Sequence, residues 1–208
     1  MSQPELLLFA RQPVSGEVKT RLLPDYTPAR AAEIAAFLIR ATVEVAASAW
    51  PGRIYLYTSP DPEHPLFREL AREFPITLAA QAEGDLGAKM HAALREGIER
   101  SGCAAVMGCD VPHCGWETLD QANDWLARGD NVLGPTDDGG YYFIGLQQAR
   151  AELFEGIEWG GDRVLAATLA RAGRLGIEFE MLPTQRDIDT AADLWLVAQK
   201  YEPLRKFL

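Results

Sequence analysis

Lysine and cysteine are scarce in this sequence. Its 208 residues include four lysines and three cysteines. The cysteines, Cys103, Cys109 and Cys114, are odd in number and form no C-x-x-C pair, which excludes the usual disulfide framework of a small secreted domain. We therefore expect a reducing compartment and a cytoplasmic protein.

Long apolar runs and an excess of positive charge are also missing. The longest apolar stretches, ELLLFA and AEIAAFLI, are much shorter than the roughly 20 residues that a helix needs to cross a bilayer. With 30 acidic and 20 basic residues the formal charge is −10, which disfavours a nucleic-acid partner. A small phosphorylated ligand in a local basic pocket stays compatible with this charge. We expect no membrane span and no nucleic-acid partner.

The sequence is rich in hydrophobic residues, at 48%, so we expect residues 1–208 to form a single domain with one core. Apolar runs of strand length alternate with amphipathic segments, which predicts a three-layer α/β/α protein with a mostly parallel sheet. The expected strands are residues 6–10, 53–57, 76–80, 104–108, 131–133, 141–146 and 179–182. The expected helices are residues 27–50, a segment starting near 87, 116–128, 163–172 and 191–200.

The segment FARQPVSGEVKTRL, residues 9–22, follows the first expected strand. Ligands of open parallel sheets bind beyond the carboxyl ends of the strands. Gly16 permits a turn close to a ligand, while Lys19 and Arg21 offer a point charge and a planar fork of donors suited to polyphosphate oxygens. The spacing is not that of a P-loop. We predict a phosphate-binding loop, with two merely solvated cations as the alternative.

The segment AEGDLGAKM, residues 82–90, follows the third expected strand and leads into a helix. Gly84 and Gly87 leave backbone N–H groups accessible to a base, a ribose or a phosphate. Lys89 adds a cation in the first helical turn, where the helix dipole disfavours it, so a negative group is expected nearby.

The fourth expected strand ends in CDVPHC, residues 109–114. Asp110 emerges where a carboxylate oxygen can hold Mg²⁺ or Mn²⁺ together with phosphate and water, and it is our first metal ligand. Zinc is the rival, because Cys103, Cys109, His113 and Cys114 lie close in sequence. The spacing argues against zinc, since alternate residues of a strand point to opposite faces.

The segment RDIDTAADL, residues 186–194, places two carboxylates on one extended face before a helix that starts at Thr190 or Ala191. Asp189 is the expected second metal ligand. Either acid could instead be a helix cap, and for Asp187 a cap is as plausible as a role as the second metal ligand.

Taken in order, FARQPVSGEVKTRL, GDLGAKM, GCDVP, GPTDDGGYYFIGL and RDIDTAADL resemble a bacterial family of glycosyltransferases in the nucleotide-diphospho-sugar transferase superfamily, which has the Rossmann-like GT-A fold. The resemblance spans residues 6 to about 195. The same fold includes the molybdenum-cofactor nucleotidyltransferases and 2-phospholactate guanylyltransferase, and the KTRL and DIDTAADL segments are similar to those of the latter.

By position, the resemblance implies that Lys19 and Arg21 contact the nucleotide phosphates and that a metal is held by Asp110. Because Cys109 precedes Asp110, there is no D-x-D motif, and a distant acid such as Asp189 must share the metal. The segments themselves and the resemblance together give the expected nucleotide-binding residues, which are Gly16, Lys19, Arg21, Gly84, Asp85, Leu86, Gly87 and Lys89.

The resemblance also implies that residues 134–145 face the acceptor. Asp137 or Asp138 would orient or deprotonate an acceptor hydroxyl as a general base. The alternative is a tight hairpin turn, because D-G is a strong turn signal. Trp159 would stack on a sugar or simply pack. The expected acceptor-binding residues are Gly139, Gly140, Tyr141 and Trp159.

Three functions follow from these segments. The first is glycosyl transfer from a nucleotide sugar to a small-molecule acceptor, with Mg²⁺ or Mn²⁺ neutralising the departing diphosphate. The second is nucleotidyl transfer from an NTP to a phosphorylated small molecule, with release of pyrophosphate. ARQPVSG replaces the glycine pair with which the related nucleotidyltransferases commonly begin, and this favours glycosyl transfer. The third is nucleotide binding without catalysis.

Overall fold

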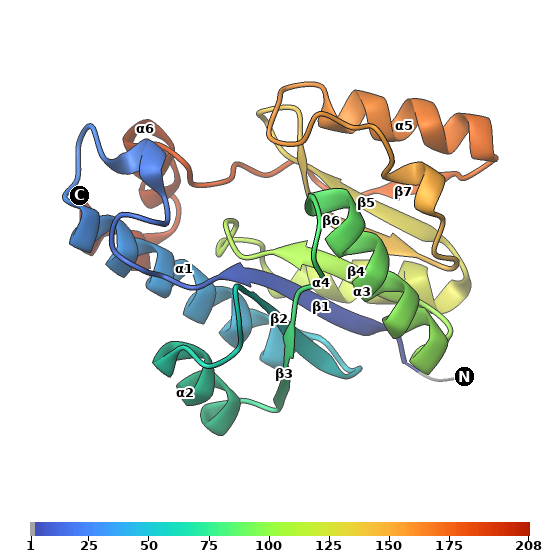
Figure 1. The fold of residues 1–208 in the computed structure, drawn as a ribbon, viewed down its shortest axis with the longest axis horizontal. Coiled ribbons are helices and arrows are strands. Elements are labelled where there is room, and N and C mark those ends of the chain that lie inside the picture. The colour runs from blue at the N-terminus through green and yellow to red at the C-terminus, as the bar shows by residue number, and fades with distance from the viewer. Residues whose placement is uncertain (1–2) are drawn as a thin grey trace.

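The computed structural model describes residues 3–208, which build a seven-stranded sheet of order β3-β2-β1-β4-β6-β5-β7 (Figure 1). Neighbouring strands are parallel except where β6 pairs antiparallel with β4 and β5. The strands are β1 Glu5–Arg11, β2 Ile54–Ser59, β3 Ile76–Ala80, β4 Ala104–Gly108, β5 Asn131–Pro135, β6 Tyr141–Leu146 and β7 Phe179–Met181. The prediction of an α/β fold with a mostly parallel sheet is confirmed.

The expected helices are present, and the structure adds α2, which the sequence analysis missed. The helices are α1 Pro28–Ala49, α2 Pro65–Glu73, α3 Leu86–Ser101, α4 Trp116–Arg128, α5 Val164–Leu175 and α6 Ala191–Ala198, with 3-10 turns at Thr20–Leu22, Ala151–Leu153 and Glu202–Phe207. The predicted start of α1 is confirmed, because the Thr27 hydroxyl accepts a hydrogen bond from Arg30 N and Pro28 occupies the first turn. α2 has nine residues and buries only Phe67 and Leu70, so it is too short to repeat its apolar spacing.

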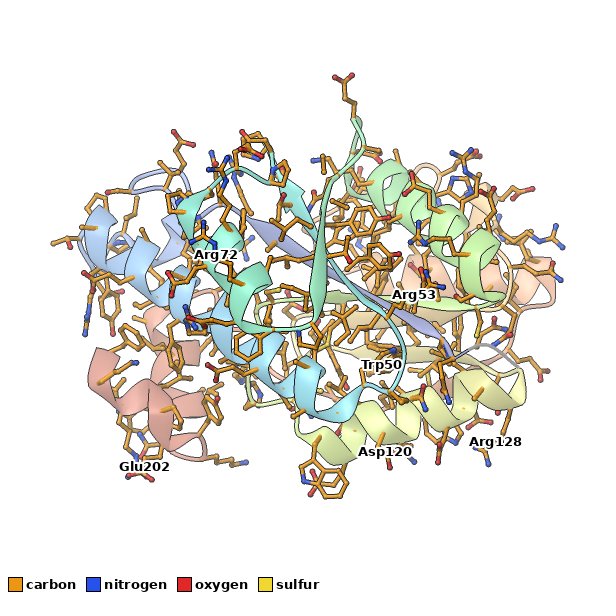
Figure 2. All side chains as sticks on the ribbon, turned by 90° about the horizontal axis from the view of Figure 1, so that it is seen from below. Trp50, Arg53, Arg72, Asp120, Arg128 and Glu202 are labelled. Carbon is orange, nitrogen blue, oxygen red and sulfur yellow. The ribbon has the colours of Figure 1, made fainter. Side chains whose placement is uncertain are left out.

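Two layers of helices cover the sheet, one on each face. Alternate residues of β1 point to opposite faces, so Leu6 and Leu8 pack with α1, α2 and α4, whereas Leu7 packs with α3 and α5. Figure 2 is viewed from the side of α1, α2 and α4, and Asp120 and Arg128 lie on the outer surface of α4. The buried faces of the helices therefore pack on both faces of the sheet, and the loops at the carboxyl ends of its strands are not covered by these helices.

A third apolar cluster joins segments that are far apart in the sequence. Leu22, from the loop after β1, packs with α1, with Ile188 before α6 and with Leu194 within α6. Figure 1 shows α6 beside α1, at the same end of the molecule as the C-terminus. This cluster fixes the loop after β1 against the segment that enters α6. Within residues 3–208, no helix is both long enough and apolar enough to cross a membrane.

Candidate functional site

The loop after β1 is held rigidly at the carboxyl edge of the sheet. Val18 and Leu22 are buried on either side of Lys19 and anchor the loop. Lys19 has φ +49°, the left-handed conformation, and caps the 3-10 turn Thr20–Leu22. Its side chain is only 7% exposed. A lysine in this unusual conformation is placed by its surroundings rather than by its own preference.

The Lys19 ammonium joins two loops that are remote in sequence. Its Nζ lies 2.7 Å from Asp110 Oδ1, just after β4, and 2.8 Å from Asp189 Oδ1, just before α6. Arg21 Nη1 lies 3.2 Å from the other carboxylate oxygen of Asp189. The structure therefore gathers the two predicted phosphate-binding cations and the two predicted metal ligands into one cluster.

The ammonium group of Lys19 is charged. Burial by itself would lower the pKa of Lys19, but the charges of Asp110 and Asp189 outweigh the burial, and the net pKa is raised above its ordinary value. One buried cation thus lies between two carboxylates, and Arg21 supplies a second positive charge beside Asp189.

Asp187 is the acid whose proton affinity is most altered. Burial raises its pKa, the neighbouring charges of Asp138, Asp189 and Asp110 raise it further, and it reaches about 6. The interpretation of Asp187 as a helix cap is wrong. The side chain of Thr190 accepts a hydrogen bond from Asp193 N, while the Asp193 carboxylate accepts one from Thr190 N, so this capping box starts α6.

Residues 136–140 form the hairpin turn between β5 and β6, so the predicted turn is confirmed. Asp138 Oδ1 accepts hydrogen bonds from the Thr136 hydroxyl at 2.6 Å and from Gly140 N at 3.0 Å. These two bonds orient the carboxylate and leave Oδ2 accessible. Asp137 differs, because its carboxylate lies 2.8 Å from Arg186 Nη2. Of the two acids predicted as a general base, Asp137 is thus paired with a cation, whereas Asp138 is held by the hairpin itself.

The hairpin and the loop before α5 pack closely together. Gly139 has φ +89°, and a Cβ atom there would lie 2.0 Å from the backbone oxygen of Asp162. Trp159 packs on Gly87 of α3, where a Cβ atom would lie 2.7 Å from the indole ring, and it meets Tyr141 edge to face. Gly87 therefore allows the indole ring to pack on α3, and Gly139 allows a close approach of two backbones. Their expected contacts with a nucleoside and an acceptor stay predictions.

The β3–α3 loop contributes mainly through Leu86. Leu86 is 44% exposed and lines a pocket, whereas the Asp85 side chain accepts a hydrogen bond from Ala88 N and caps α3. Gly84 has φ +108°, as a sharp turn requires. Lys89 is half-buried in the first turn of α3. Contacts of Gly84, Asp85 and Lys89 with a nucleotide stay predictions.

Two pockets meet at the charged cluster. The first, which we call the β1 pocket, encloses about 280 Å³ and is lined by residues of β1, the loop after it, α1, Cys109, Asp110 and Asp189. The second, which we call the β6 pocket, encloses about 240 Å³ beside it. The lining residues of the β6 pocket include Arg21, Leu86, Met90, Asp110, Asp138, Gly140, Tyr141, Trp159, Val164, Asp187 and Asp189. Arg21, Asp110 and Asp189 line both, so a ligand that spans the pockets would pass these three side chains.

The zinc alternative is wrong for the part of the chain that the structure describes. Residues 3–208 contain no group of three or more His, Cys, Asp or Glu side chains arranged to hold a metal ion. Cys103, Cys109 and Cys114 are unpaired and buried, and burial raises the pKa of each thiol. Asp110 and Asp189 are two carboxylates held at Lys19, so a Mg²⁺ or Mn²⁺ ion there, with substrate phosphates and water as its remaining ligands, stays a prediction.

Two residues of the site, Arg186 and Thr136, were not assigned a role from the sequence, and the raised pKa of Asp187 was not foreseen. Arg186 pairs with Asp137 and Asp193, Thr136 orients Asp138, and Asp187 has the raised pKa. Arg186 and Asp187 belong to RDIDTAADL, and Thr136 belongs to GPTDDGG. The sequence therefore identified the segments but not the role of each residue within them.

Comparison with solved structures supports the fold. A protein from Desulfovibrio desulfuricans G20 described as a "putative nucleotide-diphospho-sugar transferase" matches with TM-score 0.83 and 28% identity, over 97% of this chain and 89% of that one. Rv0371c from Mycobacterium tuberculosis H37Rv, solved as a complex with manganese, matches with TM-score 0.56 and 19% identity over 100% of both chains. A nucleotidyl transferase from Methanothermobacter matches with TM-score 0.58 and 14% identity, over 98% and 99%.

The search of curated proteins found no match. The resemblance to the nucleotide-diphospho-sugar transferase superfamily, inferred above from five segments, is confirmed by these solved structures. One family model matches residues 42–161, which is more than half of the chain. On this match, the chain belongs to the bacterial family DUF2064, described as "Uncharacterized protein conserved in bacteria".

Proposed function

We propose that this protein is a metal-dependent glycosyltransferase that transfers a sugar from a nucleotide diphosphate to a small-molecule acceptor. The carrying observation is the cluster in which Lys19 Nζ lies within 2.8 Å of both Asp110 and Asp189 at the carboxyl edge of the sheet. It places a buried cation, an exposed guanidinium and two hard oxygen ligands between two pockets. The 28% identical nucleotide-diphospho-sugar transferase of the same fold supports this proposal.

The donor's diphosphate would lie at Lys19 and Arg21. Lys19 supplies a buried point charge, and Arg21, with its side chain 61% exposed, supplies planar donors that can turn toward an incoming phosphate. Asp110 and Asp189 would hold Mg²⁺ or Mn²⁺. When bound, the metal neutralises negative charge on the diphosphate leaving group. The nucleoside would occupy the β1 pocket, whose lining includes Phe9, Val18 and Ile39.

The acceptor would lie in the β6 pocket, where Asp138 acts as general base. Its Oδ1 is held by Thr136 and Gly140, so Oδ2 would take the proton from the attacking hydroxyl. Tyr141 and Trp159 form an aromatic wall that limits the access of water to the sugar carbon. Asp137 is held by Arg186 and would not compete for this proton.

Product analysis tests the proposal. The protein is incubated with each common NDP-sugar or each NTP, with Mg²⁺ or Mn²⁺ and a panel of small-molecule acceptors, and the released nucleotide is identified by chromatography. We expect an NDP from one nucleotide sugar, dependence on the metal, and a loss of at least about a hundredfold in rate in Asp110→Asn. Asp120→Asn, on the outer surface of α4, is the matched control and should retain the wild-type rate.

The same assay separates the rival functions. Release of pyrophosphate from an NTP would show that the protein is a nucleotidyltransferase and not a glycosyltransferase. Nucleotidyl transfer would use the same cations and carboxylates. If nucleotides bind, if no condition gives metal-dependent turnover, and if Asp110→Asn binds nucleotides as the wild type does, the protein is a nucleotide-binding module without catalysis.

A further inference from the structure

The β6 pocket is strongly acidic around its polar part and apolar along its walls. Four carboxylates line it, against one guanidinium among the described lining residues. The carboxylates are those of Asp110, Asp138, Asp187 and Asp189. The walls include Leu86, Met90, Val164 and the aromatic pair of Tyr141 and Trp159. Its volume of about 240 Å³ suits a compound of one ring rather than a large one.

The nearby cations are already bound to carboxylates. Arg21 contacts Asp189, Lys19 is held between Asp110 and Asp189, and Arg186 lies between Asp137 and Asp193. Arg21 is the only cation among the described residues lining the β6 pocket, and it is paired with Asp189 and assigned above to the donor's diphosphate, so an anionic acceptor would meet no cation of its own. Asp138 instead offers an acceptor oxygen, which suits a hydroxyl or an ammonium donor.

We propose that the β6 pocket binds an acceptor without any anionic group, namely an uncharged or amino-bearing polyol with one apolar face, and rejects its phosphorylated forms. Hydroxyl or ammonium groups donate to the carboxylates, and the apolar face packs on Tyr141 and Trp159. A phosphate in the same place meets these carboxylates and the diphosphate of the proposed donor, to which Lys19, Arg21 and the metal are already assigned, and contacts between like charges carry a large penalty. The inference rests on the proposed function in taking the bound compound as the acceptor and in assigning the cations to the donor's diphosphate.

The selectivity bears on the choice between the two transferase reactions. A nucleotidyltransferase that adds a nucleotide to a phosphorylated molecule must hold that phosphate beside the donor. A glycosyltransferase needs only a hydroxyl. The charge of the β6 pocket therefore favours glycosyl transfer to an unphosphorylated acceptor.

Matched pairs of ligands test the selectivity directly. Binding of glucose and glucose 6-phosphate, glucosamine and glucosamine 6-phosphate, and myo-inositol and myo-inositol 1-phosphate is measured by ligand-observed NMR and calorimetry. EDTA is present so that no divalent ion bridges a phosphate to the protein. We expect at least one uncharged or amino-bearing member to bind about tenfold or more tightly than its phosphorylated partner. Equal or tighter binding of the phosphorylated members, or binding of no unphosphorylated member, would overturn the proposal.

A charge-adding variant with a matched control separates charge from shape. A Cβ atom at Gly161 makes only an ordinary contact, at 3.5 Å from Glu158 O, and Gly161 lines the β6 pocket. Gly161→Lys should therefore narrow the preference for the unphosphorylated member several-fold. Gly173→Lys, in α5 with no atom within 4 Å of a Cβ there, should leave it unchanged. An unaltered preference in Gly161→Lys would show that charge does not decide the selection.

The outcome is independent of nucleotide binding. If no nucleotide stabilises the protein in a thermal-shift panel, the proposed function fails, whereas the ligand pairs still report the selectivity of the pocket. If nucleotides bind but the phosphorylated ligands bind as tightly as their unphosphorylated partners or more tightly, only this further inference fails.

Discussion

Replacing Lys19 tests whether the cluster of Lys19, Asp110 and Asp189 is held together by charge. At about 3 Å and an effective dielectric constant of about 20, each contact contributes about 5 to 6 kcal/mol of Coulomb energy. The desolvation of a buried ammonium offsets several kcal/mol of this, and Asp110, with 50% of its side chain exposed, contributes less than Asp189. We expect Lys19→Met to lower the free energy of unfolding by about 2 to 4 kcal/mol, because the two carboxylates then repel each other with only the exposed Arg21 as a counter-charge.

The informative measurement is the same substitution in a second background. In Asp110→Asn/Asp189→Asn, Lys19 is a buried cation without its partners, so Lys19→Met should there be neutral or stabilising. Urea unfolding of the four proteins in EDTA gives both free-energy changes, and Lys200→Met, at an exposed position, should change stability by less than about 0.5 kcal/mol. An equal cost of Lys19→Met in both backgrounds would refute the electrostatic account and leave only the loss of packing.

Three further predictions follow from single features of the fold. Because the folded state raises the pKa of Asp187 from 3.8 to about 6, the folded protein binds more protons than the unfolded one in this window, and its stability falls as the pH rises from about 4 to 6. Asp187→Asn should thus raise the melting temperature in EDTA at pH 7.5 and lose this gain near pH 4; a gain independent of pH would contradict the assignment. Gly139→Ala should cost more than about 2 kcal/mol in urea unfolding, because φ is +89° and the methyl group meets Asp162 O, whereas Gly173→Ala, inside α5, should be neutral or stabilising. The three cysteines should react with an aromatic disulfide reagent at pH 8 only after unfolding, because burial shields each thiol and raises its pKa; rapid labelling of the native protein would show an accessible thiol.

The parts of the fold that were predictable are those with a strong local pattern. β3, β4 and α4 have the predicted bounds, since each combines a clear apolar period with a glycine, proline or cap at its end. The 28% identical solved structure agrees with the superfamily inferred from five short segments. α2 was missed because its apolar period is too short to read in nine residues.

The site was predictable as a set of loops but not as a set of contacts. The order of strands brings Lys19, Asp110 and Asp189 to one edge, and that followed from the α/β pattern. The pairing of Asp137 with Arg186 did not, because it depends on how two loops lie across a parallel bridge between Thr136 and Gln185. Sequence spacing carries no information on which of two adjacent aspartates faces a cation.

The reversed direction of β6 has a consequence for how this edge of the sheet is built. A parallel strand returns to the same edge only after a crossover of a dozen residues or more, usually a helix, but β6 returns after a five-residue turn. The carboxylate of Asp138 therefore lies on a hairpin whose ends are fixed by strand pairing. The cations Lys19 and Arg21 lie on a loop that leads into a helix. Changes of length or composition in that turn can therefore reshape the β6 pocket without altering α1, which follows the loop that bears Lys19 and Arg21.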